Sequence, residues 1–343
     1  QGLMGNVPAC NGPDGGLLAT DTPSTYVSPV ADVGGPVLKD RLWFYAGWSY
    51  SRNSYQRDAV FYNDPAQEQR HFEWWSYSNY LNYNLTSQLG NNVRIRFSGS
   101  NQKNKNRGTA PGLQPENDPF GFPGNTYVPL GTSMAGYTTT TFPMVNGAFD
   151  QETFDRTYTQ GGGDSWNDSY AGNVDWVVTP TFFVNATAGY FMYNNTTPPE
   201  VRYNDIRYSY SGSPCGLLDI PSSLCQASGY TSSALSNGGT VRDKFTRFFV
   251  NVNGTYFTSF FGQHTVKAGL RFERFANDVL SGATKPNVTL YWDGNYSGAR
   301  GRYGYYELTQ SGTVGDIHSD NYSLWFQDTW SPTSKLTINA GVR

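Results

Sequence analysis

Hydrophobic and polar residues alternate along several short stretches of the chain, with the period of two that half-buried β-strands show. Residues 92–100 keep apolar positions on one side and arginine and serine on the other. The apolar positions are Val93, Ile95, Phe97 and Gly99, and the polar positions are Arg94, Arg96, Ser98 and Ser100. Residues 74–85 alternate in the same way, and only a short polar segment separates the two stretches. The pattern predicts a β-hairpin.

The same hairpin unit recurs along the rest of the chain. Residues 169–178 and 182–192 form a second alternating pair, closed by Thr179, Pro180 and Thr181. Two more pairs follow, at 248–256 with 266–272 and at 322–326 with 336–342, and a single strand is expected near 40–51. No segment keeps a helical period over three turns. The sequence therefore predicts an all-β fold of about nine antiparallel strands.

The predicted connections alternate between short turns and long polar segments. Each hairpin closes with a few residues, whereas the hairpins are separated by loops at 53–71, 101–165, 194–242 and 278–318. Loops longer than about 12–15 residues are uncommon in compact soluble domains. Outer-membrane barrels have this asymmetry because one rim faces the periplasm with tight turns and the other carries extracellular loops. The alternation predicts an antiparallel transmembrane β-barrel whose first strand runs outward.

Composition is compatible with a barrel but does not select it. Aromatic residues make up 16% of the chain and charged residues only 15%, yet the mean hydropathy is -0.55. A barrel wall combines these properties because lipid-facing and lumen-facing residues alternate, and an aromatic-rich soluble sandwich would combine them too. No segment approaches the roughly 18 apolar residues of a membrane-spanning helix, so a closed barrel is the one membrane option. The net charge of -3, with scattered Lys and Arg, gives no indication of a nucleic-acid partner.

We expect the barrel to be incomplete. Single-chain bacterial barrels have an even number of strands and must pair every edge, which about nine strands cannot do. The sequence begins at Gln1 and stops at Arg343 inside a predicted strand. Residues 39–343 are therefore interpreted as part of a barrel, and residues 1–38 as the end of a plug or a linker into it.

Three segments carry short motifs in a particular order. Residues 34–45 read GGPVLKDRLWFY, and residues 264–269 read HTVKAG. Near the carboxyl end, YSLWFQDTW at 322–330 is followed by LTINAGVR at 336–343. The first segment resembles the plug-to-barrel junction of Oar-like TonB-dependent outer-membrane transporters, and the other two resemble a strand start and a hairpin of TonB-dependent receptors. The resemblance covers the chain from about residue 30 onward, although the long loops match no motif.

The resemblance implies a function and a set of partners. It implies a barrel of about twenty-two strands with an amino-terminal plug, in the outer membrane of a Gram-negative bacterium. It also implies uptake of a bulky substrate, driven by the TonB complex through the plug. The partners that the resemblance implies are outer-membrane lipid, the plug and, through the plug, the TonB complex. Neither a TonB box nor most of the plug is found in this sequence. A passive porin or adhesion barrel and a soluble carbohydrate-binding β-sandwich remain as alternatives.

Two groups of residues are candidates for binding. The first group would face the lumen and contact either the plug or a substrate, and plug contact is favoured because a plug fills so wide a barrel. Its members are Tyr80, Asn82, Asn84, Arg94, Arg96, Lys267 and Arg271. The second group consists of loop tyrosines, which either stack on sugars and other flat ligands or stabilise the loops. Its members are Tyr203, Tyr208, Tyr210, Tyr303, Tyr305 and Tyr306.

The sequence gives no indication of an enzyme, a metal site or a cofactor. The three histidines, His71, His264 and His318, are far apart and lack the spacing of a zinc site. No nucleophile elbow or phosphate-binding glycine loop is present. Cys215 and Cys225 lie close together in a loop rich in Gly, Ser and Pro, which suits a local disulfide in an oxidising compartment, with two free thiols as the alternative. Cys10 is left without a partner.

Overall fold

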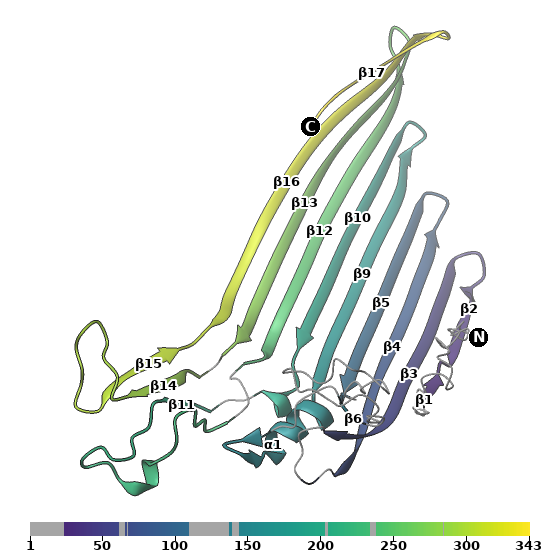
Figure 1. Ribbon diagram of the computed structural model, residues 1–343. Helices are drawn as coiled ribbons and strands as arrows, with labels where there is room; N and C mark the ends of the chain where they lie inside the picture. The colour runs from purple at the N-terminus through teal and green to yellow at the C-terminus, as the bar shows by residue number, and fades with distance from the viewer. Residues whose placement is uncertain are drawn as a thin grey trace, which may run out of the picture.

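One antiparallel sheet dominates the structure and forms the tall, curved wall of Figure 1. The computed structural model describes residues 24–61, 66, 68–109, 137–138, 144–202, 205–233, 238–283 and 285–343. The long strands are neighbours in the order in which they occur along the chain. They are β3 (Leu42–Phe61), β4 (Gln69–Leu89), β5 (Val93–Arg107), β9 (Gly162–Thr179), β10 (Phe182–Thr196), β12 (Thr240–Ser259), β13 (Gln263–Gly282), β16 (Gly312–Thr333) and β17 (Leu336–Val342). The prediction of an all-β fold with about nine antiparallel strands is confirmed.

The sheet has two edges that do not meet. At the amino-terminal edge, β1 (Ser24–Val27) and β2 (Val30–Leu38) run antiparallel to β3, and the two-residue β6 (Tyr137–Thr138) pairs with the far end of β3. At the other edge, β17 pairs only with β16 among the residues that the structure describes. The described wall is therefore an open sheet, which agrees with the expectation of an incomplete barrel.

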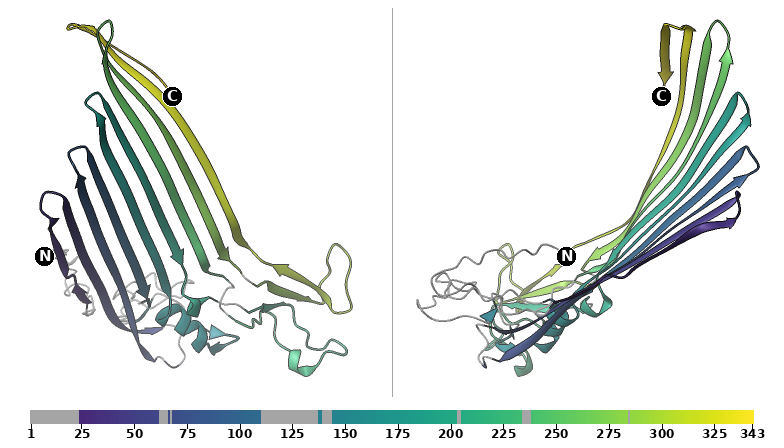
Figure 2. Two further views of the ribbon diagram at one scale, coloured as in Figure 1. Left: turned by 180° about the vertical axis from the view of Figure 1, so that it is seen from behind. Right: turned by 90° about the vertical axis from the view of Figure 1, so that its right-hand side faces the viewer.

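Short and long connections lie at opposite ends of the wall. The tight turns between β2 and β3, β4 and β5, β9 and β10, β12 and β13, and β16 and β17 all lie at the upper rim in Figure 1. The long connections lie at the lower end, where they carry the short helices and the small extra strands. Figure 2 shows that the wall curves and that successive turns step along its rim, as staggered, tilted barrel strands do.

Strand register sorts the side chains of the wall into two faces, which we call the apolar face and the polar face. One cross-strand row of the apolar face consists of Ile95, Val174, Ala186, Val252, Leu270 and Leu324. The next row, on the polar face, consists of Arg96, Asn173, Thr187, Asn251, Arg271 and Ser323. One step along every strand changes the face because side chains alternate with a period of two.

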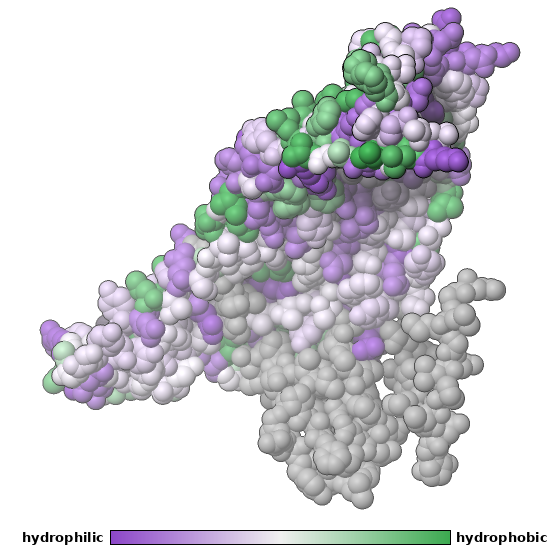
Figure 3. All heavy atoms as spheres, turned by 90° about the horizontal axis from the view of Figure 1, so that it is seen from above, coloured by the Kyte–Doolittle hydropathy of each residue, from purple (hydrophilic) through white to green (hydrophobic). Residues whose placement is uncertain are grey.

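The apolar face is continuous only in the half of the wall next to the short turns, and we call this part the apolar band. On β3 the band runs from Leu42 to Tyr50, and on β16 it runs from Tyr322 to Phe326. A run of this length on β3 rises roughly 30 Å along a tilted strand, the scale of a barrel's lipid-facing belt. Figure 3, viewed from the short-turn end, shows green hydrophobic residues in patches along the edge of the curved wall.

The strands extend further toward the long loops than the alternation predicts. β3 continues to Phe61 and β4 begins at Gln69, so most of the segment 53–71 that was predicted as loop is strand. β5 likewise reaches Arg107, and β16 already begins at Gly312. Beyond the apolar band both faces of the sheet carry polar residues, so the hydropathy pattern stops although the backbone hydrogen bonds continue.

A compact aromatic cluster lies at the long-loop end of β3 and β4. The helical turns α1 (Gln151–Phe154) and η1 (Asp155–Thr159) begin at Asp150, whose side chain accepts a hydrogen bond from the Thr153 amide. These turns place Phe154 and Tyr158 against Phe61 and Phe72, with ring centroids 5.3 to 6.4 Å apart. Within the described part of the chain, no helix is long and apolar enough to cross a membrane.

Three connections carry small elements. β7 (Met144–Val145) and β8 (Ala148–Phe149) form a two-stranded sheet before α1. β11 (Arg207–Ser211), β14 (Asn287–Trp292) and β15 (Gly304–Thr309) form a three-stranded sheet, which we call the loop sheet. The single turns η2 (Pro199–Val201) and η3 (Ser222–Leu224) complete the loop end. The loop sheet joins two connections that are far apart in the sequence.

Candidate functional site

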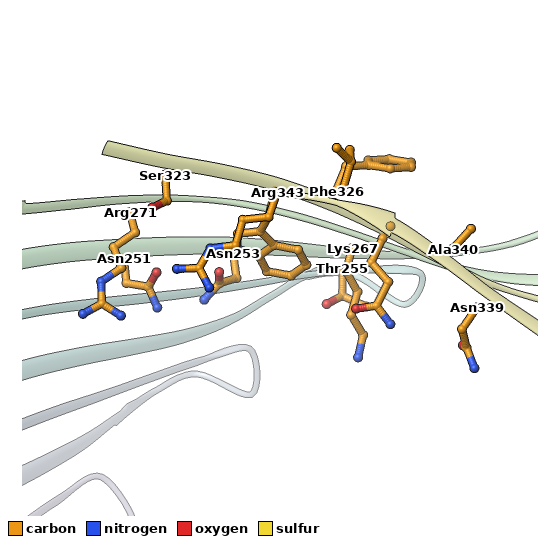
Figure 4. Close-up of a pocket in the computed structure, with 14 residues that line it drawn as sticks. Asn251, Asn253, Thr255, Lys267, Arg271, Ser323, Phe326, Asn339, Ala340 and Arg343 are labelled. Carbon is orange, nitrogen blue, oxygen red and sulfur yellow. The ribbon is translucent and has the colours of Figure 1, made fainter. Parts of the chain in front are cut away.

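The polar face of the wall contains the hollows that a ligand or a packing domain would enter. One of them, which we call the large hollow, has a volume of about 840 Å³ and lies over β12, β13, β16 and β17. Its polar lining includes Asn251, Asn253, Thr255, Lys267, Arg271, Ser323, Gln327 and Asn339. In Figure 4, Asn251, Thr255, Lys267 and Asn339 point to one side of the sheet, whereas Phe326 and Ala340 point to the other. Two of the seven predicted lumen-facing residues, Lys267 and Arg271, therefore lie in this hollow.

An ion-pair network borders the large hollow. Glu273 Oε1 accepts hydrogen bonds from Arg247 Nε at 2.6 Å and from Arg271 Nη2 at 3.0 Å. One carboxylate thus lies between two guanidinium groups, and this arrangement leaves an excess of positive charge on the polar face. Lys267 adds a further cation that makes no hydrogen bond or ion pair with the described residues. The hollow is therefore lined by amides and cations.

A second, smaller hollow of about 280 Å³ lies over β3, β4 and β5. Tyr80, Asn82 and Asn84 line it, so three more of the predicted lumen-facing residues lie together. The amide oxygen of Asn82 is buried and has no hydrogen-bond partner within the described part of the chain. A buried acceptor of this kind is available to a donor from a plug or a ligand.

The remaining two predicted residues differ from each other. Arg96 Nη2 donates to Asn173 Oδ1 at 2.8 Å and to Asp175 Oδ2 at 3.0 Å, so this side chain already links β5 to β9. Arg94 is exposed on the same face. All seven residues lie on the polar face, but they lie in separate places along the wall and do not form one site.

Sequence reasoning missed several residues of the large hollow. Asn251 and Asn253 of β12 and Trp325 of β16 lie beside Lys267 and Arg271 of β13. Their polar-face positions follow from the alternation, which was available in the sequence. Their proximity follows from the pairing register, which was not.

Glycines shape this wall by making room for rings. A β-carbon on Gly269 would lie 2.4 Å from Trp325 Nε1, and one on Gly189 would lie 2.4 Å from Cε1 of Phe249. Each of these aromatic rings therefore lies over a glycine of the neighbouring strand, and the Trp325 ring lies against the wall of the large hollow. Gly269 belongs to the segment HTVKAG, so this packing gives a physical reason for a glycine there.

The other motif residues join the β12–β13 turn to β16 at the short-turn rim. His264 Nδ1 and Asp328 Oδ2 are 2.7 Å apart, and the indole of Trp330 donates to the carbonyl oxygen of Phe261 at 2.9 Å. The His264 and Trp330 rings are stacked with centroids 5.7 Å apart. These contacts assign the motif residues a structural role at the rim.

The predicted loop tyrosines occupy the loop sheet in two different ways. Tyr210 is only 8% exposed and contacts Tyr230 and Trp292, so it belongs to the interior of the loop assembly. Burial, and next the nearby Tyr230, raises the pKa of Tyr210 above its ordinary value. Tyr208 is 41% exposed on the same strand.

The other loop tyrosines form an aromatic hollow of about 240 Å³ on β14 and β15. Tyr303, Tyr305 and Tyr306 line it together with Leu290, Tyr291, Trp292 and Arg302. Tyr305 stacks on Tyr291 with centroids 4.4 Å apart, while Tyr306 is 65% exposed. Tyr203 lies outside the described residues. Stacked and exposed rings of this kind suit a flat or sugar-like ligand.

A disulfide joins Cys215 and Cys225 in the connection between β11 and β12, with their Cα atoms 4.7 Å apart. Cys10 lies outside the described residues. Across the described ranges, no group of three or more His, Cys, Asp or Glu side chains is arranged to hold a metal ion. The candidate site described above consists of polar and aromatic surfaces.

Comparison with known proteins agrees with this geometry. The chain is 23% identical to the TonB-dependent transporter Oar of Myxococcus xanthus, over 91% of this chain and 32% of the relative. It therefore spans about a third of the length of that curated relative. The outer membrane transporter YddB from Escherichia coli has a similar fold, with a TM-score of 0.50 and 13% identity over 93% of this chain and 33% of the other.

A family model supplies the assignment. The model described as the outer membrane beta barrel domain matches residues 137–343, which is more than half of the chain. That span contains the long strands from β9 to β17 and the large polar hollow. The wall has one exposed apolar face, short turns at one rim and long connections at the other, as this family does. The chain thus belongs to the outer membrane β-barrel domain family and lies in the outer membrane of a Gram-negative bacterium.

Proposed function

We propose that this chain supplies part of the wall and the ligand-capturing loops of a TonB-dependent transporter that takes up a bulky ligand. In this proposal the long-loop end faces the exterior and the short-turn end faces the periplasm. The polar face lines the lumen, where it contacts a plug and the passing ligand. The similarity to the transporter Oar supports the TonB dependence.

The large polar hollow is the observation that carries the proposal. Its lining combines amides with Lys267 and Arg271, and the wall's own side chains leave about 840 Å³ of it unfilled. A wide barrel whose wall leaves such space is filled by a plug, by ligand or by water. Buried polar groups require partners, and Asn82 has none among the described residues. A plug provides partners of this kind over the whole wall.

The aromatic hollow of the loop sheet is proposed as the place of first contact with the ligand. Tyr303, Tyr305 and Tyr306 present rings at the end of the wall where the long connections gather. We propose that lumen-facing cations contact the plug, and that the loop tyrosines select the ligand by stacking. No catalytic role is proposed for either set.

Conductance of the full-length protein in a planar lipid bilayer tests the plugged-transporter proposal. A plugged barrel gives no steady current, and it binds the purified periplasmic domain of TonB in detergent solution. A passive porin gives stepwise open channels and no TonB binding, and that result would overturn the proposal.

A charge reversal tests the contact between the lumen wall and the plug. Lys267→Glu is expected to loosen the plug, so that brief open-channel events become more frequent. Ser319→Glu, on the same face but outside both hollows, is the matched control. Equal conductance in both variants would assign Lys267 to the ligand or to water.

A further inference from the structure

Three cations lie on the apolar face just beyond the apolar band. They are Arg52 on β3 and Lys103 and Lys105 on β5. Register places Arg52 opposite Tyr77 on β4, and Tyr77 opposite Lys105, so these side chains occupy one cross-strand row. Lys103 lies one step nearer to the band, opposite Trp166 of β9. The three cations form a patch, which we call the cationic belt.

Aromatic rings hold the cationic belt in place. Arg52 Cζ and Lys105 Nζ each lie 5.9 Å from the centroid of the Trp75 ring, so two cations share one indole. Lys103 Nζ lies 5.8 Å from the centroid of Trp166. The ring of Trp75 also stacks on Tyr77, with an interplanar angle of 5°. Attraction to the aromatic faces restrains long side chains that would otherwise move freely in solvent.

The cationic belt has no carboxylate partner among the described residues. Asp164 lies opposite Lys105 in register, but its two carboxylate oxygens accept from Arg107 at 2.7 and 3.0 Å. Asp168 accepts from Asn101 at 2.7 Å. Glu73 lies further toward the long loops, beyond Trp75, and makes no ion pair with the belt. The three cations of the belt therefore make no direct ion pair within the described part of the chain, and they outnumber Asp168, the nearby carboxylate that no described cation holds.

Two arginines in the other half of the wall make ion pairs instead. On the apolar face beyond the band, Arg242 pairs with Asp278 at 2.7 Å and Arg274 pairs with Asp320 at 2.6 Å. The difference is not one of residue type, because both halves use Arg and Lys. It lies in whether the facing carboxylate is free to pair with the cation, because Asp164, which faces Lys105, is held by Arg107.

The cationic belt is continuous with the lipid-facing surface. Successive positions of β3 on this face are Ala46, Trp48, Tyr50 and then Arg52. Two residues of strand rise about 7 Å, so Arg52 lies one step beyond Tyr50, and Lys103 lies in the same cross-strand row as Tyr50. That depth is the headgroup region of the bilayer, where aromatic girdles lie.

We propose that the cationic belt binds the phosphate groups of a glycolipid in the outer leaflet, of the bis-phosphorylated lipid A class. Unpaired Lys and Arg side chains attract phosphate, and the adjoining apolar band accommodates the acyl chains of the same molecule. The proposal rests on the orientation under the proposed function, in which the long loops face outward. It requires no transport, so it can fail or hold independently of uptake.

Binding of lipid A by the full-length protein tests the proposal. Delipidated protein in detergent micelles is titrated with bis-phosphorylated lipid A and with the same lipid after removal of both phosphates, and bound lipid is counted by native mass spectrometry. The triple variant Arg52→Gln, Lys103→Gln and Lys105→Gln is expected to bind bis-phosphorylated lipid A about 100-fold more weakly, given the usual attraction of three cations to an anionic lipid surface. Binding of the dephosphorylated lipid is expected to stay unchanged.

The matched control is the double variant Arg242→Gln and Arg274→Gln. Both arginines lie on the same face of the wall, and each pairs with a carboxylate of the neighbouring strand. The proposal is overturned if the control weakens binding as much as the triple variant, or if wild-type protein binds both lipids equally. It is also overturned if inorganic phosphate displaces the lipid completely, which would indicate a free-phosphate site.

Two further measurements separate the possible failures. Should the triple variant fold poorly, as judged by the heat-dependent mobility of the barrel in gels, the single variants Lys103→Gln and Lys105→Gln replace it, each with an expected weakening of about fivefold. Binding of the periplasmic TonB domain is measured on the same samples. The triple variant is expected to lose lipid binding and to retain TonB binding. Open channels in a wild-type protein that still binds the lipid would overturn only the proposed function.

Discussion

The apolar band and the aromatic cluster at the long-loop end use the same residue types in different ways. In the cluster, Phe61 is fully buried and Phe72 is 2% exposed, because helical turns pack directly on the strands. In the band, Phe97 is 42% exposed and Leu324 is 74% exposed. The cluster is stabilised by protein packing against protein, whereas the side chains of the band are covered by no described part of the chain and face the lipid.

This difference teaches that burial measured within one chain does not identify the core of a membrane wall. A soluble domain with so many exposed large apolar residues would aggregate, since contiguous apolar patches mark interaction surfaces. Here the patch forms a belt that follows one face of the strands. The experiments below change one region and leave the other intact.

Truncation of a buried ring is expected to give the largest effect. Phe72→Ala removes a ring that contacts Phe61, Phe154 and Tyr158, and it leaves a cavity, at a cost of about 3–5 kcal/mol to the packing of the loop end. Hydrogen exchange is expected to accelerate in residues 149–160 and not in the short-turn half of the wall. Phe97→Ala is the comparison, because lipid fills the space that it leaves. Equal losses of free energy in the two variants would contradict the distinction.

A charge placed in the band is expected to be the next largest effect. Phe97→Arg inserts a cation into the lipid-facing face, which costs about 2–4 kcal/mol near the bilayer midplane. Ser98→Arg introduces the same residue one position along β5 on the polar face, and its cost is expected to stay below about 1 kcal/mol. Urea-dependent unfolding in phospholipid vesicles measures both. A larger cost for Ser98→Arg would show that the two faces are assigned the wrong way round.

A smaller effect is expected where a ring lies over a glycine on the polar face. Gly269→Val places side-chain atoms where the indole of Trp325 now lies, and overpacking of this kind costs about 1–3 kcal/mol. The displaced ring is expected to enter the large hollow and change the tryptophan fluorescence. Gly315→Val, where an added β-carbon meets nothing within 4 Å, is the control. Unchanged fluorescence in Gly269→Val would mean that the ring does not lie over this glycine.

The smallest effect concerns ionisation in the loop sheet. The Tyr291 hydroxyl donates to Glu307 Oε2 at 3.1 Å, and this hydrogen bond, together with the carboxylate charge, raises the pKa of Tyr291 above its ordinary value. Because the pKa of Tyr291 is raised in the folded state, its hydrogen bond to Glu307 stabilises the fold while Tyr291 is protonated. This contribution is fully present below about pH 10 and is lost as the pH rises through the pKa of Tyr291 in the folded protein. Glu307→Gln is expected to shift one tyrosine to a lower pKa in an absorbance titration against wild type. Tyr291→Phe is the control, because it removes that transition. An identical titration of wild type and Glu307→Gln would contradict the contact.

Sequence patterns gave the fold and the faces but not the extent of the strands. The alternation at 92–100 predicted the faces of β5 correctly, because lipid and lumen impose opposite polarity on neighbouring positions. The predicted strand ended too early, because β5 continues through Lys103 and Lys105 beyond the apolar band, where both faces of the sheet carry polar residues. Alternation reports the surroundings of a strand, and backbone pairing continues after those surroundings change.

The candidate site could be predicted only in part, for a related reason. The polar-face positions of Lys267 and Arg271 were available from the sequence, and so were the loop tyrosines as a class. The division into a hollow over β12 to β17 and another over β3 to β5 was not available, because it depends on register and curvature. The role of Glu273 between two arginines was missed for the same reason.

Local residue order by itself determined the all-β class, the strand faces and the alternation of tight turns with long connections, because each of these depends on period and turn chemistry alone. Tertiary structure alone decided which side chains of different strands meet. It placed Arg52 and Lys105 over one indole, bound Arg107 to the carboxylate that faces Lys105, and left a belt of positive charge beside the lipid. The physical reason is that charge compensation depends on neighbours across strands, and those neighbours are far apart in the sequence.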